Sequence, residues 1–305
     1  MSTRPMRITI RVGQAKLTVD RIDPVHPAGD PFIFQHGMGG DSSQPIGYLH
    51  GQDQSCTVVA INARGHGAST DAHPADCRFD RFADDVIAVA DELGIARFIA
   101  GGISMGAGTA INLVVRYPQR VSALVLCRPA WRDEPQDQWN RAVYKQIADI
   151  LDTTFLDTTP PTVHRDDPTA ADPPRTDDVA QRALAQFCQT PTYAQVLAAA
   201  PAAAASLRHQ ITRPRAAANT SVLRCMPADR PTLSRVGWAA ITVPALVIGH
   251  HDDPFHPYPV AELYARSIPA ATLTTVPSKD ASPAAFAEQI GEALTRFLDH
   301  QAAST

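Results

Sequence analysis

A serine enclosed by glycines, in the pentapeptide Gly-Ile-Ser-Met-Gly at 102–106, constrains the fold of this chain more than any other feature. An apolar run over 97–101 precedes it and a helical pattern over 107–117 follows it, so the expected order is strand, tight turn, helix. A turn this tight needs small residues two positions before and two positions after the serine, and glycine stands at both. It would lift the Ser104 hydroxyl clear of the sheet as a nucleophile and direct the N–H of Met105 toward a developing oxyanion. The alternative is a glycine-rich turn that binds an anion through its backbone, with the serine as a helix cap.

The composition limits the classes of function that this chain can serve. Lys and Arg total 27 against 31 Asp and Glu, which gives a formal net charge of −4 without a basic cluster, so we expect no nucleic-acid partner. No apolar stretch reaches the ~18 residues of a membrane span, and no apolar run follows the first residues as in a secretion signal. The five cysteines are odd in number and form no C-x-x-C pair, which is typical of a reduced, cytoplasmic protein.

Short apolar runs alternate with helical patterns along most of the chain. This alternation predicts an α/β fold with a mostly parallel, twisted sheet flanked by helices. The predicted strands are Arg7–Arg11, Ala15–Asp20, Pro31–Gln35, Thr57–Asn62, Arg97–Gly101, Val121–Cys127, Ala245–Gly249 and Ala271–Val276. The predicted helices outside the middle of the chain are Phe82–Leu93, Met105–Tyr117, Val260–Ser267 and Pro283–His300.

The segment 129–240 interrupts this rhythm, since it is polar, rich in alanine and proline, and holds no convincing strand. Five prolines within 157–176 predict a loop or hinge. Because the sheet resumes afterwards, we expect residues 1–128 and 241–305 to form one core and 129–240 to be a helical lid inserted into it. An independent helical domain is the alternative. The helical periods of the segment lie at Trp139–Leu151, Asp177–Cys188 and Thr192–Arg208.

Four motifs stand directly after predicted strands, where open α/β sheets place their sites. They are His-Gly-Met-Gly-Gly at 36–40, Asn-Ala-Arg-Gly-His-Gly at 62–67, Gly-Ile-Ser-Met-Gly at 102–106 and Gly-His-His-Asp-Asp-Pro at 249–254. Together with Tyr-Pro-Gln-Arg-Val at 117–121 and Val-Pro-Ala-Leu-Val at 243–247, they resemble the α/β-hydrolase fold family over the chain apart from the lid.

The resemblance implies roles for several positions. Ser104 matches the nucleophile of the family, and the backbone N–H groups of Met38 and Met105 match the two donors of its oxyanion hole. Two fixed N–H dipoles of this kind stabilise the charge on a carbonyl oxygen by ~3–4 kcal/mol each. His36 and Gly37 precede Met38 and are expected beside the substrate, although His36 also fits a packing role beneath the loop.

The family's acid follows a late strand, and this chain offers Asp252 and Asp253 there. We favour Asp253, because the acid in this fold commonly precedes an apolar loop closed by a proline, here Pro257. Both aspartates could instead form turns. Asp133 and Glu134, which follow an earlier strand, are a further position for the acid.

The family's histidine is missing from its usual place, since the interval 276–288 contains none. Without an imidazole beside it, a serine hydroxyl is a poor nucleophile at neutral pH. Three explanations stay open: a histidine from elsewhere serves, Lys279 acts as a desolvated base, or the pocket no longer performs serine hydrolysis. We assign the base to His256. The other histidines within reach are His250 and His251 in the acid loop and His164 and His209 in the lid.

These patterns predict an α/β-hydrolase-fold enzyme for a small, largely apolar carbonyl compound such as an ester, lactone or thioester. The alternatives are a non-hydrolytic relative (a lyase, isomerase or cyclase of a biosynthetic pathway) and a catalytically silent ligand-binding protein. Trp131 and Trp139 are candidate substrate-binding residues. No cofactor is expected, because the glycines at 101–106 fit the elbow better than a dinucleotide fingerprint. No metal is expected either, because the ligand-rich run 250–253 consists of adjacent loop residues. The oligomeric state is left open.

Overall fold

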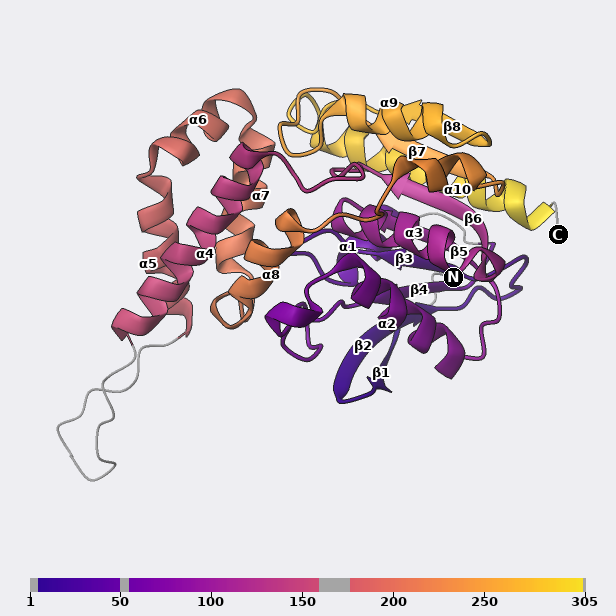
Figure 1. Ribbon diagram of the computed structural model, residues 1–305, viewed down its shortest axis with the longest axis horizontal. Coiled ribbons are helices and arrows are strands. Elements are labelled where there is room, and N and C mark those ends of the chain that lie inside the picture. The colour runs from indigo at the N-terminus through magenta and orange to yellow at the C-terminus, as the bar shows by residue number, and fades with distance from the viewer. Residues whose placement is uncertain (1–4, 50–54, 159–175, 304–305) are drawn as a thin grey trace.

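The computed structural model describes residues 5–49, 55–158 and 176–303, and within these residues eight strands form one sheet (Figure 1). The strand order is β1-β2-β4-β3-β5-β6-β7-β8. Strand β2 pairs antiparallel with β1 and with β4, and every pair from β4 to β8 is parallel. The predicted α/β fold with a mostly parallel sheet is therefore confirmed. The strands are β1 (Met6–Val12), β2 (Ala15–Ile22), β3 (Phe32–Gln35), β4 (Val58–Ile61), β5 (Phe98–Ile103), β6 (Val121–Cys127), β7 (Ala245–Gly249) and β8 (Ala271–Thr275).

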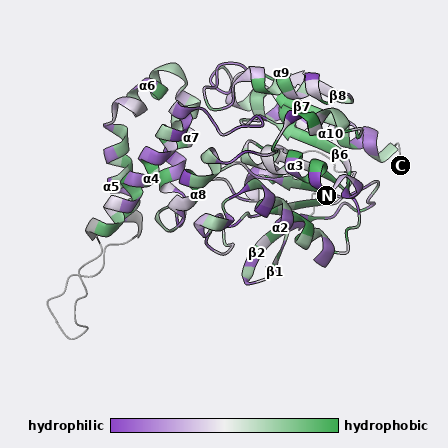
Figure 2. Ribbon diagram, in the orientation of Figure 1, coloured by the Kyte–Doolittle hydropathy of each residue, from purple (hydrophilic) through white to green (hydrophobic). Residues whose placement is uncertain are grey.

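The central strands are buried along their whole length. Every residue of β3, β4, β5 and β7 is buried, and Figure 2 shows the hydrophobic character of this part of the sheet. Continuous apolar runs of this kind are what parallel strands need when helices cover both faces. The edge strands β1 and β8 contain several exposed residues, as expected at the two edges of a sheet.

Helices cover the sheet on both faces. On one face α2, α3 and α9 pack against the strands around buried residues such as Val86, Ile111 and Tyr264. On the other face α1 and α10 pack around Leu49, Phe286 and further apolar side chains. The bounds of these helices are Ser43–Leu49 for α1, Phe79–Glu92 for α2, Met105–Arg116 for α3, Tyr258–Ser267 for α9 and Pro283–Ala303 for α10.

A helical segment joins β6 to β7 and lies beyond one end of the sheet (Figure 1). Its described residues contain helices and no strand. It has an apolar cluster of its own, and Phe255, from the loop after β7, is buried within that cluster. The predicted loop at 157–176 falls almost wholly on 159–175, outside the described residues. The helices are α4 (Gln138–Thr158), α5 (Thr176–Cys188), α6 (Pro191–Ala199), α7 (Pro201–Thr212) and α8 (Thr220–Cys225).

One predicted helix of this segment is wrong. The expected single helix Thr192–Arg208 is two helices, α6 and α7, which meet at Ala200. The backbone there leaves helical geometry, and Pro201 starts the second helix at the position where a missing N–H is tolerated. The alanine-rich pattern masked this break, and the short helices α1 and α8 were not predicted. No helix in the described part of the chain has both the length and the apolar character needed to cross a membrane.

Candidate active site

Ser104 occupies a sharp turn between β5 and α3. Its backbone lies at φ 55° and ψ −107°, a conformation that L-residues rarely adopt. A Cβ added to Gly102 would lie 1.9 Å from the carbonyl carbon of Gly106, and one added to Gly106 would lie 2.4 Å from the Gln35 carbonyl oxygen. Only glycine therefore fits at both positions. Because these two residues have no side chain, the chain can turn tightly enough to hold Ser104 in its strained backbone conformation.

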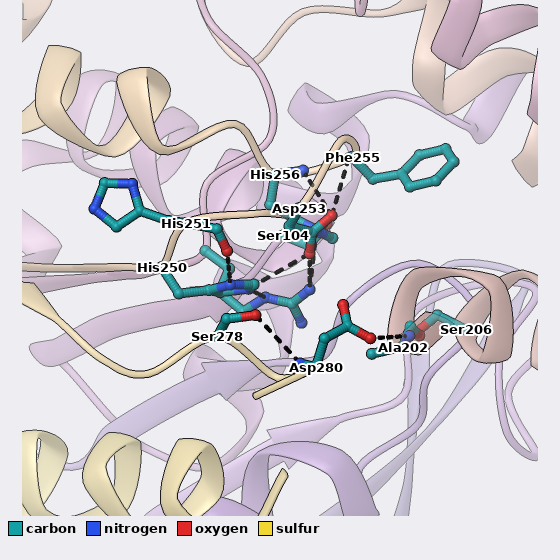
Figure 3. A network of polar contacts seen from close by, with 11 residues as sticks. Ser104, Ala202, Ser206, His250, His251, Asp253, Phe255, His256, Ser278 and Asp280 are labelled. Atoms are coloured by element: carbon teal, nitrogen blue, oxygen red, sulfur yellow. Dashed lines mark hydrogen bonds and ion pairs between the residues drawn. The ribbon is translucent and has the colours of Figure 1, made fainter. Parts of the chain in front are cut away.

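His256 brings its ring to this serine from the loop after β7, here called the 250–257 loop (Figure 3). Its Nε2 lies 2.8 Å from the Ser104 Oγ, and its Nδ1 lies 2.8 Å from the Asp253 Oδ2. The other carboxylate oxygen of Asp253 accepts the backbone N–H of Phe255 at 2.9 Å and that of His256 at 3.2 Å. The carboxylate and the imidazole thus come from one tight turn, three residues apart, and the turn itself aligns them.

The bond to Asp253 selects the tautomer of the His256 ring. When the Nδ1–H donates to the carboxylate, the Nε2 has a free lone pair that can accept the Ser104 hydroxyl proton. His256 is almost enclosed, with 14% of its side chain exposed. Burial and the positive charge of Arg128 lower the pKa of its imidazole, and the Asp253 carboxylate opposes them only in part.

Arg128 is a buried cation beside this pair. It follows the last residue of β6 with φ 50°, and its Nη2 lies 2.5 Å from the Asp253 Oδ2 and 3.0 Å from the His256 Nδ1. Its Nε donates to the Nε2 of His250 at 3.1 Å. Burial alone would raise the pKa of Asp253. The interactions with His256 and Arg128 overcome this and hold that pKa far below its usual range.

The loop that follows β3, here called the 36–41 loop, runs close to Ser104. A Cβ on Gly37 would lie 3.5 Å from the Ser104 Cβ. The N–H groups of Gly37, Gly39 and Gly40 are bonded within the protein, whereas none of the described residues accepts the N–H of Met38. Met105 is the first residue of α3, where a backbone N–H has no acceptor within the helix. Met105 directly follows the serine, and Met38 directly follows Gly37, the residue of the 36–41 loop that approaches Ser104.

The remaining candidates from the sequence lie as follows. His36 is buried, with Nδ1 donating to the Gly37 carbonyl at 2.8 Å and Nε2 accepting the Ala63 N–H at 3.0 Å, so both ring nitrogens are engaged beneath the loop. Trp131 is buried against Phe79 in the protein core. Trp139 is partly exposed and packs on Phe255 at 5.4 Å between ring centroids.

Among the described residues, none of the acidic and basic alternatives forms a hydrogen bond with the Ser104 hydroxyl, whose partner is His256. Asp252 is exposed at φ 63° and forms a turn, and His251 is exposed and stacks on Tyr258. Asp133 pairs with Arg235. Arg132 pairs with Glu134, and His209 lies on α7. His164 lies outside the described residues.

Sequence reasoning missed two side chains at this site, Arg128 and Gln210. Gln210, from α7, donates its Nε2 to the Met38 carbonyl at 2.6 Å and so ties the helical segment to the 36–41 loop. The available signal for Arg128 was its place directly after a strand, at the edge of the sheet where the other motifs gather. Nothing in the sequence pattern marked Gln210.

Comparison with known proteins places this geometry in a family. The chain matches the family model described as alpha/beta hydrolase fold over residues 30–281. The protein therefore belongs to the α/β-hydrolase fold family. A thermophilic esterase from Thermogutta terrifontis has the same fold, with a TM-score of 0.66 at 19% identity over 98% of this chain and 99% of the esterase.

Curated relatives match shorter parts of the sequence. The dihydrolipoyllysine-residue acetyltransferase component of the acetoin cleaving system from Pseudomonas putida is 32% identical over 102 residues, 33% of this chain and 27% of the relative. The 3-oxoadipate enol-lactonase 2 of Acinetobacter baylyi is 33% identical over 110 residues, 35% of this chain and 40% of the relative. The chain thus spans well under half the length of these two relatives.

Proposed function

We propose that this protein is a serine hydrolase that cleaves an ester, lactone or thioester of a small, largely apolar carbonyl compound. Ser104 is the nucleophile, His256 the general base and Asp253 the acid that orients the base. The observation that carries the proposal is the unbroken series of hydrogen bonds from the Ser104 hydroxyl through the His256 ring to the Asp253 carboxylate. A nucleophile, a base within 3.2 Å and a third group that orients the base are the general requirement for an activated serine.

The first half of the reaction acylates the serine. The Ser104 Oγ attacks the carbonyl carbon of the substrate while His256 Nε2 takes the hydroxyl proton. The carbonyl oxygen becomes an oxyanion, and the N–H groups of Met38 and Met105 donate to it. When the intermediate collapses, the bond to the leaving oxygen or sulfur breaks, and His256 returns the proton to that atom.

The second half releases the acyl group. Water takes the place of the leaving group, His256 removes one of its protons, and the resulting hydroxide attacks the acyl carbon. The same two N–H groups stabilise the second oxyanion, and the Ser104 Oγ leaves with the proton from His256. Asp253 stays ionised throughout, because its role is to orient and stabilise the imidazolium.

We further propose that residues 129–240 act as a lid on a core made of 1–128 and 241–305. Two contacts support it: Gln210 of α7 holds the Met38 carbonyl, and Phe255 is buried in the apolar cluster of the helical segment. A cover tied to both loops of the site would exclude water from the acyl intermediate. Gly37 would line the floor of the pocket and Trp139 its wall, while the packing of His36 and Trp131 supports an indirect role.

The names of similar proteins agree with this class of substrate, since they include an esterase and enol-lactonases. The proposed partner is therefore one small molecule. The cysteines in the described residues are free thiols, which suits the cytoplasmic location expected from the sequence.

The test is hydrolysis of short p-nitrophenyl esters by the purified full chain and by Ser104→Ala. We expect measurable turnover in the wild type, a loss of about 10⁴-fold or more in the variant, and an acyl-enzyme mass on the wild type alone after rapid quenching. Circular dichroism would show that the variant is folded. Equal rates in the two proteins, or a folded wild type that turns over no ester, lactone or thioester, would refute the proposal.

A further inference from the structure

A hollow adjoins the 36–41 loop on the side that faces the helical segment. It has a volume of about 380 Å³ and is lined by Met38, Gly39 and Gly40 of that loop, by His209 and Gln210 of α7, and by Lys279. Met38 directly follows Gly37, on which a Cβ would lie 3.5 Å from the Ser104 Cβ, so the hollow adjoins the loop that runs past the proposed nucleophile. It is large enough for a short substituent of a substrate.

Lys279 is the unexplained residue in this hollow. It lies in the loop after β8, half-buried, and no hydrogen bond or ion pair reaches its ammonium group from any described residue. The neighbouring Ser278 and Asp280 appear in the same close-up view as Ser104 and His256 (Figure 3). Burial and the nearby Arg128 guanidinium lower the pKa of Lys279, and the charges of Asp253 and Asp280 offset this only in part.

The acidic side chains around the hollow form hydrogen bonds or ion pairs with groups other than Lys279. Asp280 accepts the Ala202 N–H at the start of α7 at 2.6 Å. Asp41, which also lines the hollow, accepts the backbone N–H of Ser43 at 2.9 Å and its hydroxyl at 2.5 Å, at the start of α1. The Asp253 carboxylate is bonded to Arg128 and His256. None of these carboxylates forms an ion pair or hydrogen bond with Lys279.

Lys279 also lacks a part in the proposed chemistry, because the Ser104 Oγ has the imidazole of His256 as its partner. A partly desolvated ammonium that neither pairs with the protein nor serves as the base is suited to bind an anion of the substrate. The matching group on a substrate is a single negative charge.

We propose that Lys279 and the hollow between the 36–41 loop and α7 form a subsite for a carboxylate carried by the substrate, a proposal that rests on the proposed hydrolase function. The substrate is then a small ester, lactone or thioester with one anionic end. The carboxylate would bond to the Lys279 Nζ while the carbonyl oxygen lies between the N–H groups of Met38 and Met105.

The test compares kcat/KM for pairs of esters that differ by one carboxylate. On the acyl side the pair is the p-nitrophenyl half-ester of succinic acid and p-nitrophenyl butyrate, and on the leaving-group side it is 3-carboxyphenyl butyrate and phenyl butyrate. After subtraction of the uncatalysed rates, the wild type should favour the carboxylate ester of at least one pair about tenfold, the worth of one charge-assisted hydrogen bond. Lys279→Met should bring that ratio to about one, and Lys279→Glu should bring it below one.

Lys16→Met is the matched control, since Lys16 is an exposed lysine on β2, and it should keep the wild-type ratio. Two outcomes overturn the proposal. In one, the wild type shows no preference for the carboxylate in either pair. In the other, Lys279→Met lowers kcat/KM equally for both esters of a pair, as loss of a base would.

A binding measurement separates this proposal from the proposed function. The same esters are titrated by calorimetry into the variants Ser104→Ala and Ser104→Ala/Lys279→Met. This measurement reports binding and does not depend on turnover. Tighter binding of the carboxylate ester that disappears with Lys279 supports the subsite even if the wild type hydrolyses nothing. Equal binding of the paired esters by Ser104→Ala overturns it.

Discussion

Replacement of Arg128 by methionine should alter both the stability of the protein and the pH range of its activity. Arg128 and Asp253 form an ion pair of 2.5 Å, with 9% and 7% of their side chains exposed. Removal of one partner from a buried pair leaves an uncompensated charge and usually costs about 3–5 kcal/mol. Because Asp253 keeps His256 and two backbone N–H groups, we expect the lower end, about 3 kcal/mol of the free energy of unfolding.

The activity should respond in a direction fixed by the charge. His256 acts as a base only when it is unprotonated, and Arg128 lowers the pKa of its imidazole by repelling the imidazolium. In the wild type, the acid limb of kcat/KM against pH should thus lie below the ordinary histidine value of about 6.5. Without Arg128, burial still lowers the pKa of His256 but the repulsion is gone, so the Asp253 carboxylate has more effect and the limb should move to higher pH.

The assay is kcat/KM for p-nitrophenyl butyrate between pH 4.5 and 9, together with urea unfolding at pH 7.5. Arg128→Lys is the control, since it keeps the positive charge and should leave the acid limb closer to that of the wild type. If folded Arg128→Met has an unmoved or lowered acid limb, the electrostatic reasoning about this arginine is wrong.

Two other predictions concern the fold around the site. Gly102→Ala should prevent folding or cost several kcal/mol of stability, because its Cβ would lie 1.9 Å from the Gly106 backbone. The control Gly47→Ala, in α1 with no atom within 4 Å of the added Cβ, should be neutral or stabilising by up to about 1 kcal/mol. Thermal denaturation compares the two variants, and equal melting temperatures would contradict the elbow geometry. Burial lowers the pKa of His36 to about 4. As the pH falls below 6.5, this side chain therefore becomes protonated in the unfolded state, whereas in the folded state it stays neutral until about pH 4. This residue should therefore remove roughly 3 kcal/mol of stability as the pH falls through that interval. In denaturant unfolding at several pH values between 6.5 and 4, the free energy of unfolding of His36→Asn should fall less steeply with pH than that of the wild type, by a slope equivalent to about one proton. The same slope in both proteins would argue against a neutral buried ring.

Local patterns predicted much of this fold. The elbow could be read from the sequence because small residues and a strand-to-helix change are both local properties, and the β strands followed from apolar runs. The junction of α6 and α7 escaped prediction because alanine favours helix on both sides of it, and only Pro201 marks the break. A helix boundary set by one residue within a uniform window is hard to separate from a continuous helix.

The arrangement around Ser104 depends on contacts that a sequence does not encode locally. His256 was one of five histidines considered, and its selection by geometry depends on a turn in which Asp253 accepts two backbone N–H groups. The role of Arg128 depends on a long-range contact, 125 positions away along the chain. An arginine after a strand ordinarily suggests a solvated side chain, so the burial that gives this one its effect had to come from the structure.

The central claim is that a histidine from the loop after β7 activates Ser104. Its most direct test is the second-order rate constant for labelling of the protein by a fluorophosphonate, measured by intact-protein mass spectrometry. The probe should label the His256→Ala variant at least about 10²-fold more slowly than the wild type. His251→Ala, which removes an exposed neighbour in the same loop, should label at close to the wild-type rate. Labelling of folded His256→Ala at the wild-type rate would contradict the account.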